Sequence, residues 1–218
     1  MASNLRLYGY WRSSATWRVR IALNLKGLAC EVLPVHLLRD GGEQHRAEFL
    51  KLNPMAQVPV LLHGERVLRQ SVAIIEYLED LRPDPPLLPR EARDRARARA
   101  MAQLVACEIH PLCNLRVLQH LERVMGVDEA GRVAWMRHWM GEGLAALEAM
   151  VLDHPSTGDF CEGDAPGLAD CFLVPQLYNA RRHGLELDPY PTLLRIEANC
   201  NALPEFEAAR PEQQPDAN

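Results

Sequence analysis

The stretch that decides the fold is RSSATWRVRIALNLKG, from Arg12 to Gly27. Apolar residues in its second half recur at the spacing of a helical face, and a glycine closes it, as at many helix ends. Leu5–Tyr10 before it and Cys30–Val35 after it show the period-two pattern and the β-branched or aromatic residues typical of strands. A strand, a helix and a strand in this order predict a βαβ unit with two parallel strands.

Two further strands and two further helices complete the first half of the chain. Val58–Leu62 and Arg66–Gln70 have strand character and are separated only by the three residues 63–65. Such a short connection predicts an antiparallel hairpin. A short helix is expected at Arg46–Leu52, and SVAIIEYLEDL, Ser71–Leu81, has a strong helical pattern. The predicted order of elements is therefore βαβαββα.

A proline-rich segment separates this half from a helical second half. RPDPPLLPRE, Arg82–Glu91, carries four prolines, which neither a helix nor a central strand accommodates. Beyond it, helical spacing predicts four helices: Glu91–Glu122, Asp128–Leu152, Leu168–His183 and Thr192–Ala202. We therefore expect a first domain over residues 1–82, a linker over residues 83–90 and an all-α domain over residues 91–218. The tail PEQQPDAN is polar, and we expect poor order at its end.

The composition is that of an ordinary globular protein. The 218 residues carry a formal charge of 24 − 29 = −5, with 48% hydrophobic and 24% charged residues, which excludes disorder as the main state. No apolar stretch is long enough to span a membrane, and Arg6 and Arg12 interrupt the segment where a signal peptide would be apolar. We therefore expect a cytoplasmic protein that does not associate with a membrane.

The basic run and the cysteines have structural interpretations that need no ligand. The arginines of Arg90–Arg99 alternate with alanine and acidic residues, which indicates a solvated helix face, with nucleic-acid binding as the alternative. The six cysteines include no Cys-x-x-Cys pair, so we expect reduced, mostly buried thiols. Cys107, His110 and Cys113 have metal-like spacing but no fourth ligand nearby, so packing is favoured and no metal is predicted.

Polar residues gather where the first predicted strand meets its helix. Arg12, Ser13, Ser14 and Thr16 bring hydroxyls to a helix N-terminus, where free backbone N–H groups favour an anion such as a thiolate. Serine at a helix start also serves as an ordinary N-cap. Both interpretations remain open from these residues alone.

Two further junctions in the first half have chemical content. Gln57-Val58-Pro59 opens a strand, and this proline is a candidate for a cis peptide bond, with an ordinary edge proline as the alternative. Gln70-Ser71 offers an amide, a hydroxyl and a second helix N-terminus, which could hold the carboxylate of a ligand or could be a simple cap.

The helical half contributes a set of polar and basic residues: His110, Asn114, Arg116, Arg181 and Arg182. Most arginines of a protein are surface residues, so these side chains indicate a binding function only if they converge on a pocket.

Four strings, in this order and spacing, resemble the zeta class of glutathione transferases: RSSATWRVRIALNLKG, FLKLNPMAQVPVL, QSVAIIEYLED and LADCFLVPQLYNARR. The resemblance covers essentially the whole chain from Leu5 to the PYPTL and QPD segments. It implies the glutathione transferase fold, with a thioredoxin-like N-terminal domain that binds glutathione and an all-helical C-terminal domain that binds the electrophile. It also implies a homodimer.

The resemblance implies a role for each matching residue. Ser13 corresponds to the catalytic serine that stabilises the thiolate. The implied contacts of the cofactor glutathione are Ser13, Ser14, Gln44, Val58, Gln70, Ser71, His110 and Asn114. Arg12, Arg116 and Arg182 match residues that hold the carboxylates of the substrate, and Arg12 is also a catalytic candidate.

The activity implied by the resemblance is the glutathione-dependent cis–trans isomerisation of maleylacetoacetate to fumarylacetoacetate, a step of tyrosine and homogentisate breakdown. Rotation about a carbon–carbon double bond requires that the bond be removed for a time, and reversible addition of a thiolate does so. The substrate is a small dicarboxylate keto acid, and glutathione is returned unchanged. Glutathione is therefore expected as a cofactor.

Three other functions remain open. The first is the same isomerisation of maleylpyruvate in the gentisate pathway, and the second is glutathione conjugation or dehalogenation of small α-halo acids. The third is a non-catalytic binding module with the transferase fold. A thioredoxin or glutaredoxin oxidoreductase is not favoured, because residues 13–16 hold no cysteine where that chemistry needs two.

Two positions depart from the pattern of the class. Ala15 stands where some members have a cysteine after the two serines, so any chemistry of that thiol does not transfer to this chain. The capping box of the helical half reads Gly167-Leu168-Ala169-Asp170, with glycine in place of serine or threonine. Glycine retains most of the stability of an N-cap, and Asp170 can still reach backbone N–H groups.

Overall fold

The computed structural model describes residues 4–217, and its contacts divide the chain into two compact units. The first unit comprises the chain up to Leu87 together with the segment from Asn201 onward, and the second comprises Leu88–Cys200. The second domain was expected to run to residue 218. The contacts instead group the C-terminal segment with the first unit.

The first unit is built on a four-stranded sheet in the order β2-β1-β3-β4. The strands are β1 (Leu5–Gly9), β2 (Glu31–Pro34), β3 (Val60–His63) and β4 (Arg66–Arg69). β1 pairs with β2 in parallel, whereas β3 is antiparallel to both β1 and β4. The predicted βαβ unit and the predicted hairpin are both confirmed.

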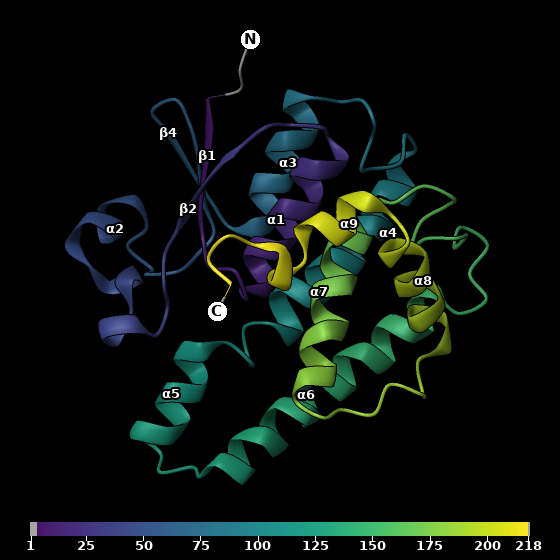
Figure 1. The fold of residues 1–218 in the computed structure, drawn as a ribbon. Helices are drawn as coiled ribbons and strands as arrows, with labels where there is room; N and C mark the ends of the chain where they lie inside the picture. Colours follow the sequence, from purple (N-terminus) through teal and green to yellow (C-terminus); the bar gives the residue numbers. More distant parts are fainter. Residues whose placement is uncertain (1–3, 218) are drawn as a thin grey trace. The chain divides into compact units, whose positions relative to one another are not determined.

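Helices cover both faces of this sheet. α1 (Ser14–Leu25) and α3 (Ser71–Leu81) lie on one face, and α2 (Ala47–Leu52) lies on the other (Figure 1). Phe49 of α2 is buried with Val35, Val60 and Leu62, so apolar side chains hold the short helix to the sheet. Two 3₁₀ turns, η1 (Arg39–Gly41) and η2 (Glu43–His45), precede α2.

The C-terminal segment packs on the first helix. It forms α9 (Pro204–Ala209) and a final 3₁₀ turn, η4 (Pro211–Gln213), and α9 contacts α1. The Asn24 side-chain amide donates to the carbonyl of Glu205 over 2.8 Å. Phe206 is fully buried. The sequence predicted neither element, because both are short and begin at a proline inside a polar segment.

A buried lysine fixes the start of the proline-rich segment. The Nζ atom of Lys26 is fully buried, pairs with the carboxylate of Glu79 and donates to the carbonyl of Pro85. Glu79 also accepts a hydrogen bond from the backbone N–H of Leu87 over 2.9 Å. A buried charge is tolerated only when it is paired in this way. No helix or strand lies between residues 82 and 91.

The second unit is helical, and one predicted helix is interrupted in it. Its helices are α4 (Ala92–Gln103), the π-helix η3 (Leu104–Ile109), α5 (Leu115–Arg123), α6 (Glu129–Val151), α7 (Leu168–Arg182) and α8 (Pro191–Asn201). The prediction of one continuous helix over Glu91–Glu122 is wrong. Pro111 has no N–H to continue the ladder, and Asn114 caps a new helix through its side chain.

An arginine of α4 holds the long loop between α6 and α7. Arg97 donates to the carbonyls of Met150 and Cys161 over 2.8 and 2.9 Å and to the Thr157 hydroxyl over 2.7 Å. It also forms an ion pair with Glu162. One side chain therefore satisfies acceptors at the end of α6 and at three residues of the loop.

Asp170 closes the capping box of α7, as the sequence predicted. Its carboxylate accepts from the backbone N–H of Gly167 over 2.8 Å and from that of Cys161 over 3.0 Å. Full burial raises the pKa of Asp170, and these hydrogen bonds oppose that rise.

None of the helices within residues 4–217 is long and apolar enough to cross a membrane.

Replacing Asp170 by alanine should destabilise the fold by about 2–4 kcal/mol, because a buried and a half-buried backbone donor lose their acceptor. Urea unfolding of the wild type and the variant measures this difference. The matched control is Asp188→Ala, which removes an exposed carboxylate and should change the free energy of unfolding by less than about 0.5 kcal/mol. Equal losses in the two variants would contradict the role given to Asp170.

Candidate functional site

Ser13 caps helix α1. Its Oγ accepts a hydrogen bond from the backbone N–H of Thr16 over 3.2 Å, and its own N–H donates to the carbonyl of Tyr10 over 3.0 Å. The capping interpretation is therefore confirmed, yet the hydroxyl hydrogen remains able to donate. Ser14 opens the helix and is half-buried, as Ser13 is. A hydroxyl donor at a helix N-terminus is a favourable place for an anion.

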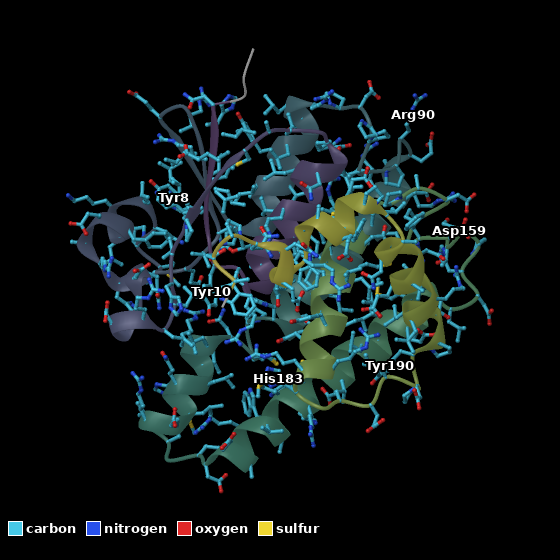
Figure 2. The ribbon with its side chains drawn as sticks, in the orientation of Figure 1. Tyr8, Tyr10, Arg90, Asp159, His183 and Tyr190 are labelled. Carbon is cyan, nitrogen blue, oxygen red and sulfur yellow. The ribbon has the colours of Figure 1, made fainter. Side chains whose placement is uncertain are left out.

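Arg12 and two aromatic residues border this serine. The guanidinium carbon of Arg12 lies 5.1 Å from the ring centroid of Trp11, a cation–π contact. Tyr10, labelled in Figure 2, packs edge-on against Trp11 and His36 with centroid distances of 5.8 and 5.1 Å. Aromatic rings therefore pack together on the segment just before Ser13.

The backbone of Trp11 is held by two charged residues that the sequence did not reveal as site residues. Its N–H donates to the Asp216 carboxylate over 3.0 Å, and its carbonyl accepts from Arg20 Nη2 over 2.9 Å. Arg20 also donates from Nε to the carbonyl of Ala209 over 3.0 Å. Burial lowers the pKa of Arg20 to about 10, and the charge of Asp216 works against this shift. The tail predicted to be poorly ordered thus provides a specific contact at Asp216.

Gln70 and Ser71 form the second helix N-terminus of the first unit. Gln70 has φ 70° and ψ 121°, a conformation that costs a residue with a side chain about 1–3 kcal/mol. Ser71 is buried, and its Oγ accepts from Arg18 Nη1 over 3.3 Å. Arg18 belongs to α1 and is only 1% exposed, so it connects the two helix N-termini. No local sequence pattern marks this arginine beyond its place in a helix.

Gln44 presents an unsatisfied acceptor. The residue lies in η2 and is only 5% exposed, and its Nε2 donates to the carbonyl of Leu37 over 3.3 Å. Its Oε1 is buried and has no hydrogen-bond partner among residues 4–217. Buried polar atoms in native proteins are nearly always paired, so this oxygen points to a ligand or a water that donates to it.

Val58 precedes Pro59 in a cis peptide bond, the arrangement for which this proline was a candidate. The side chain of Val58 packs against the buried cluster around Val60 and Phe49. The backbone of Val58 is therefore fixed at the start of β3.

The register of the sheet brings these groups to one edge. Tyr8 lies opposite Val60, and Val60 lies opposite Arg69 in the next strand. Gly9 lies opposite Pro34 on the other side of β1. The residues that follow β1, β2 and β4 and the residues that precede β3 therefore meet at the same end of the sheet. These are the segments that carry Ser13, Gln44, Gln70 and Val58.

The break between η3 and α5 carries the polar residues of the second unit. Asn114 caps α5 by accepting from the backbone N–H of Arg116 over 3.2 Å, and the Arg116 side chain is exposed. His110 ends the π-helix and is half-buried. Trp135 of α6 holds the break by donating from Nε1 to the carbonyl of Leu112 over 2.8 Å. π-Helical turns inside α-helices occur frequently at functional sites.

The end of α7 lies beside the same part of α6. Arg137 Nε donates to the carbonyl of His183, labelled in Figure 2, over 2.8 Å. Trp135 and Arg137 are two residues apart on α6, so they attach the break and the end of α7 to different sides of that helix. Arg182 is the exposed last residue of α7. Its neighbour Arg181 is committed to a two-pronged ion pair with Glu197.

Four of the cysteines do not present a thiolate near neutral pH. Burial raises the pKa of Cys30 and of Cys113 to about 11. It raises the pKa of Cys161 and of Cys200 further, with the nearby Asp170 carboxylate adding to the rise. These four thiols are therefore poorly suited to act as thiolates. The Ser13 hydroxyl and the N-terminus of α1 are instead suited to stabilise the thiolate of a bound ligand.

Comparison with known proteins assigns the family. The family model for "Glutathione S-transferase, N-terminal domain" matches residues 7–86. The chain is 50% identical to a probable maleylacetoacetate isomerase of Vibrio cholerae, over 98% of this chain and 99% of that protein. A solved bacterial maleylpyruvate isomerase, described as a zeta-class glutathione S-transferase, is 46% identical and superimposes with a TM-score of 0.94 over 98% of this chain and 100% of its own. The chain belongs to the zeta class of glutathione transferases.

One solved member of this class was determined with glutathione in its active site. The maleylacetoacetate isomerase of Anaeromyxobacter dehalogenans with bound glutathione is 50% identical to this chain, with a TM-score of 0.88 over 100% of this chain and 99% of its own. The glutathione transferase fold predicted from the sequence is therefore confirmed.

The strained backbone of Gln70 should separate stability from ligand binding in this zeta-class protein. Gln70→Gly relieves the strain at the positive φ, and we expect a gain of about 1 kcal/mol after the entropic cost of glycine. The same variant removes the side-chain amide and should weaken glutathione binding. Urea unfolding and calorimetric titration with glutathione measure the two effects.

The matched variant is Gln70→Ala, which removes the same amide but keeps a side chain at the positive φ. It should weaken glutathione binding without the gain in stability. A Gln70→Gly protein less stable than the Gln70→Ala protein would contradict the strain assigned to this residue.

Proposed function

We propose that this chain catalyses the glutathione-dependent cis–trans isomerisation of maleylacetoacetate to fumarylacetoacetate. The relatives named for this activity and 50% identical over nearly the whole chain support the proposal. The observation that carries it is the Ser13 hydroxyl at the N-terminus of α1, on the edge of the sheet that also carries Gln44, Val58 and Gln70. This arrangement suits a bound thiolate with an extended peptide attached.

The residues of the first unit fit glutathione. Ser71 and the N-terminus of α3 offer hydroxyl and backbone N–H donors to the γ-glutamyl carboxylate, with the Gln70 amide beside them. Val58 offers its backbone to the extended peptide, as strand-adding ligands generally require. The unpartnered Oε1 of Gln44 accepts an N–H from the same ligand. Ser14, His110 and Asn114 are the remaining contacts that the resemblance to the class implies.

The bound tripeptide supplies a thiolate, which adds reversibly to the double bond so that the two carbons can rotate. Ser13 donates its hydroxyl hydrogen to the sulfur, and the N-terminus of α1 adds a positive potential. Thiols in comparable positions have pKa values of about 3.5–7.5 instead of ~8.5. Ser13 therefore keeps the sulfur ionised near neutral pH.

Three arginines hold the substrate in this proposal. Arg12 lies next to Ser13 in the chain, Arg116 lies at the start of α5, and Arg182 is the last residue of α7. The substrate is a small dicarboxylate keto acid, and guanidinium groups bind carboxylates with two parallel hydrogen bonds. The same positive charges stabilise the negative charge that develops on the carbonyl oxygen of the substrate during addition.

Maleylpyruvate is the second candidate substrate. The maleylpyruvate isomerase that superimposes on this chain with a TM-score of 0.94 favours it, and the two substrates share the maleyl half. The proposal also includes a first unit that binds glutathione, a helical unit that binds the substrate, a homodimeric assembly and a cytoplasmic location. Light scattering of the purified protein tests the dimer.

The first experiment follows the conversion of maleylacetoacetate and of maleylpyruvate, each with and without glutathione. Ser13→Ala should lower kcat about 100-fold, because a donor to the developing charge is lost. Ser13→Thr keeps a hydroxyl and should retain much more activity. The rate with each substrate is measured by the absorbance of its product.

Turnover of neither substrate by the wild-type protein, with glutathione still bound, would replace the proposal with conjugation or dehalogenation of α-halo acids. Failure to bind glutathione would favour a non-catalytic module. A Ser13→Ala protein with wild-type kcat would remove Ser13 from the mechanism.

Arg182→Ala should raise KM and lower kcat, each by about tenfold, because a charged hydrogen bond to the substrate carboxylate is lost. The matched control is Arg181→Ala, which removes the neighbouring charge and its ion pair with Glu197. The control should lower thermal stability and leave KM near the wild-type value. Equal KM values for the two variants would exclude a specific contact of Arg182 with the substrate.

A further inference from the structure

The loop that carries Ser13 is attached to the C-terminal segment of the chain. Trp11 stands two residues before Ser13, and its backbone N–H donates to the carboxylate of Asp216, 205 residues away in the sequence. We propose that Asp216 is a positioning residue that holds the Trp11–Ser13 backbone in its catalytic conformation. This inference rests on the proposed function.

Both polar groups of the Trp11 backbone are bound by charged side chains. Asp216 accepts from its N–H over 3.0 Å, and Arg20 donates to its carbonyl over 2.9 Å. The next fixed group is the N–H of Ser13, which donates to the carbonyl of Tyr10 over 3.0 Å. Hydrogen bonds with one charged partner are roughly twice as strong as neutral ones. The segment between β1 and α1 therefore has little freedom while Asp216 is in place.

The segment that leads to Asp216 is held by Arg20 of α1. Arg20, which is 5% exposed, carries the opposite charge, and the interaction of the two opposes the lowering of the Arg20 pKa. Arg20 also binds the carbonyl of Ala209 over 3.0 Å, so the guanidinium that fixes the loop also fixes the end of α9. Pro211 is buried at the start of the last turn. The C-terminal segment is thus anchored to the first unit a few residues before the contact with Trp11.

This arrangement predicts that loss of the Asp216 carboxylate lowers the catalytic rate and leaves glutathione binding nearly unchanged. The proposed glutathione contacts at Gln44, Val58, Gln70 and Ser71 lie on other segments of the first unit. Loss of the Asp216 carboxylate releases the backbone that aims the Ser13 hydroxyl, and misplacement by about 1 Å can reduce a rate 100-fold. The pKa of the bound thiol should rise, whereas the affinity for glutathione should change little.

The test compares Asp216→Ala, Asp216→Asn and the wild type, with Glu212→Ala as a control on the same tail. Glu212 is exposed and forms an ion pair with Arg210 on the same tail. Asparagine keeps an oxygen that accepts from the Trp11 N–H, so Asp216→Asn separates the hydrogen bond from the charge. The measurements are kcat with the better of the two maleyl substrates, the dissociation constant of glutathione, and the pKa of the bound thiol from the ultraviolet absorbance of its thiolate. Thermal unfolding of each variant monitors the fold.

We expect Asp216→Ala to lower kcat about 10- to 100-fold and to raise the thiol pKa, with the glutathione dissociation constant within about threefold of the wild type. Asp216→Asn should recover most of kcat, and Glu212→Ala should match the wild type. If Asp216→Ala does not fold, the Asp216→Asn protein decides. Wild-type kcat in that variant supports the hydrogen bond as the positioning contact, and a loss of about 10- to 100-fold in kcat overturns the hydrogen bond as that contact.

The outcomes separate this inference from the function on which it rests. An active wild type with an equally active Asp216→Ala protein overturns the role of Asp216 and leaves the isomerase proposal intact. Loss of glutathione binding in parallel with loss of kcat overturns it as well, because that pattern indicates general disruption of the unit. A wild type without glutathione binding and without turnover overturns both.

Discussion

The register of the four-stranded sheet is the constraint on which the candidate site of the first unit depends. Pairing of Tyr8 with Val60 and of Val60 with Arg69 places the ends of three strands in one row. A shift of one residue would reverse every side chain of a strand and expose the buried valines and leucines. The hydrophobic core therefore fixes the register, and the register fixes which loops meet. The polar site follows from apolar packing a few residues away.

The order of elements in the first unit could be predicted because each one carries its own periodic pattern. The prediction of one long helix over residues 91–122 was wrong, because no change in the periodic pattern marks the break. Helical spacing continues on both sides of the break, so periodicity alone cannot reveal it. Pro111 and Asn114 were the local signals, since one removes a backbone donor and the other caps the next helix. The short helix α9 was missed because it lies within a polar, proline-containing stretch.

The candidate site was predictable where its residues have local roles, and less so where their partners are distant. Ser13 stands at a helix start that the chain itself marks. Gln44 carries no local pattern and was indicated only by resemblance to the zeta class. Arg18 meets its partner 53 residues away and Asp216 meets its partner 205 residues away. Contacts over such separations arise from tertiary packing, which no local pattern of residues encodes.

The division of the chain has a consequence for its synthesis. The first unit is left at Leu87 and rejoined at Asn201, so residues 88–200 are translated between its two parts. Translation adds about 5–20 residues per second. The emerging sheet therefore waits for roughly ten seconds with the α9 face of α1 uncovered and the Trp11 N–H without its carboxylate. A ribosome stalled before Pro204 holds every strand of the first unit but neither α9 nor Asp216.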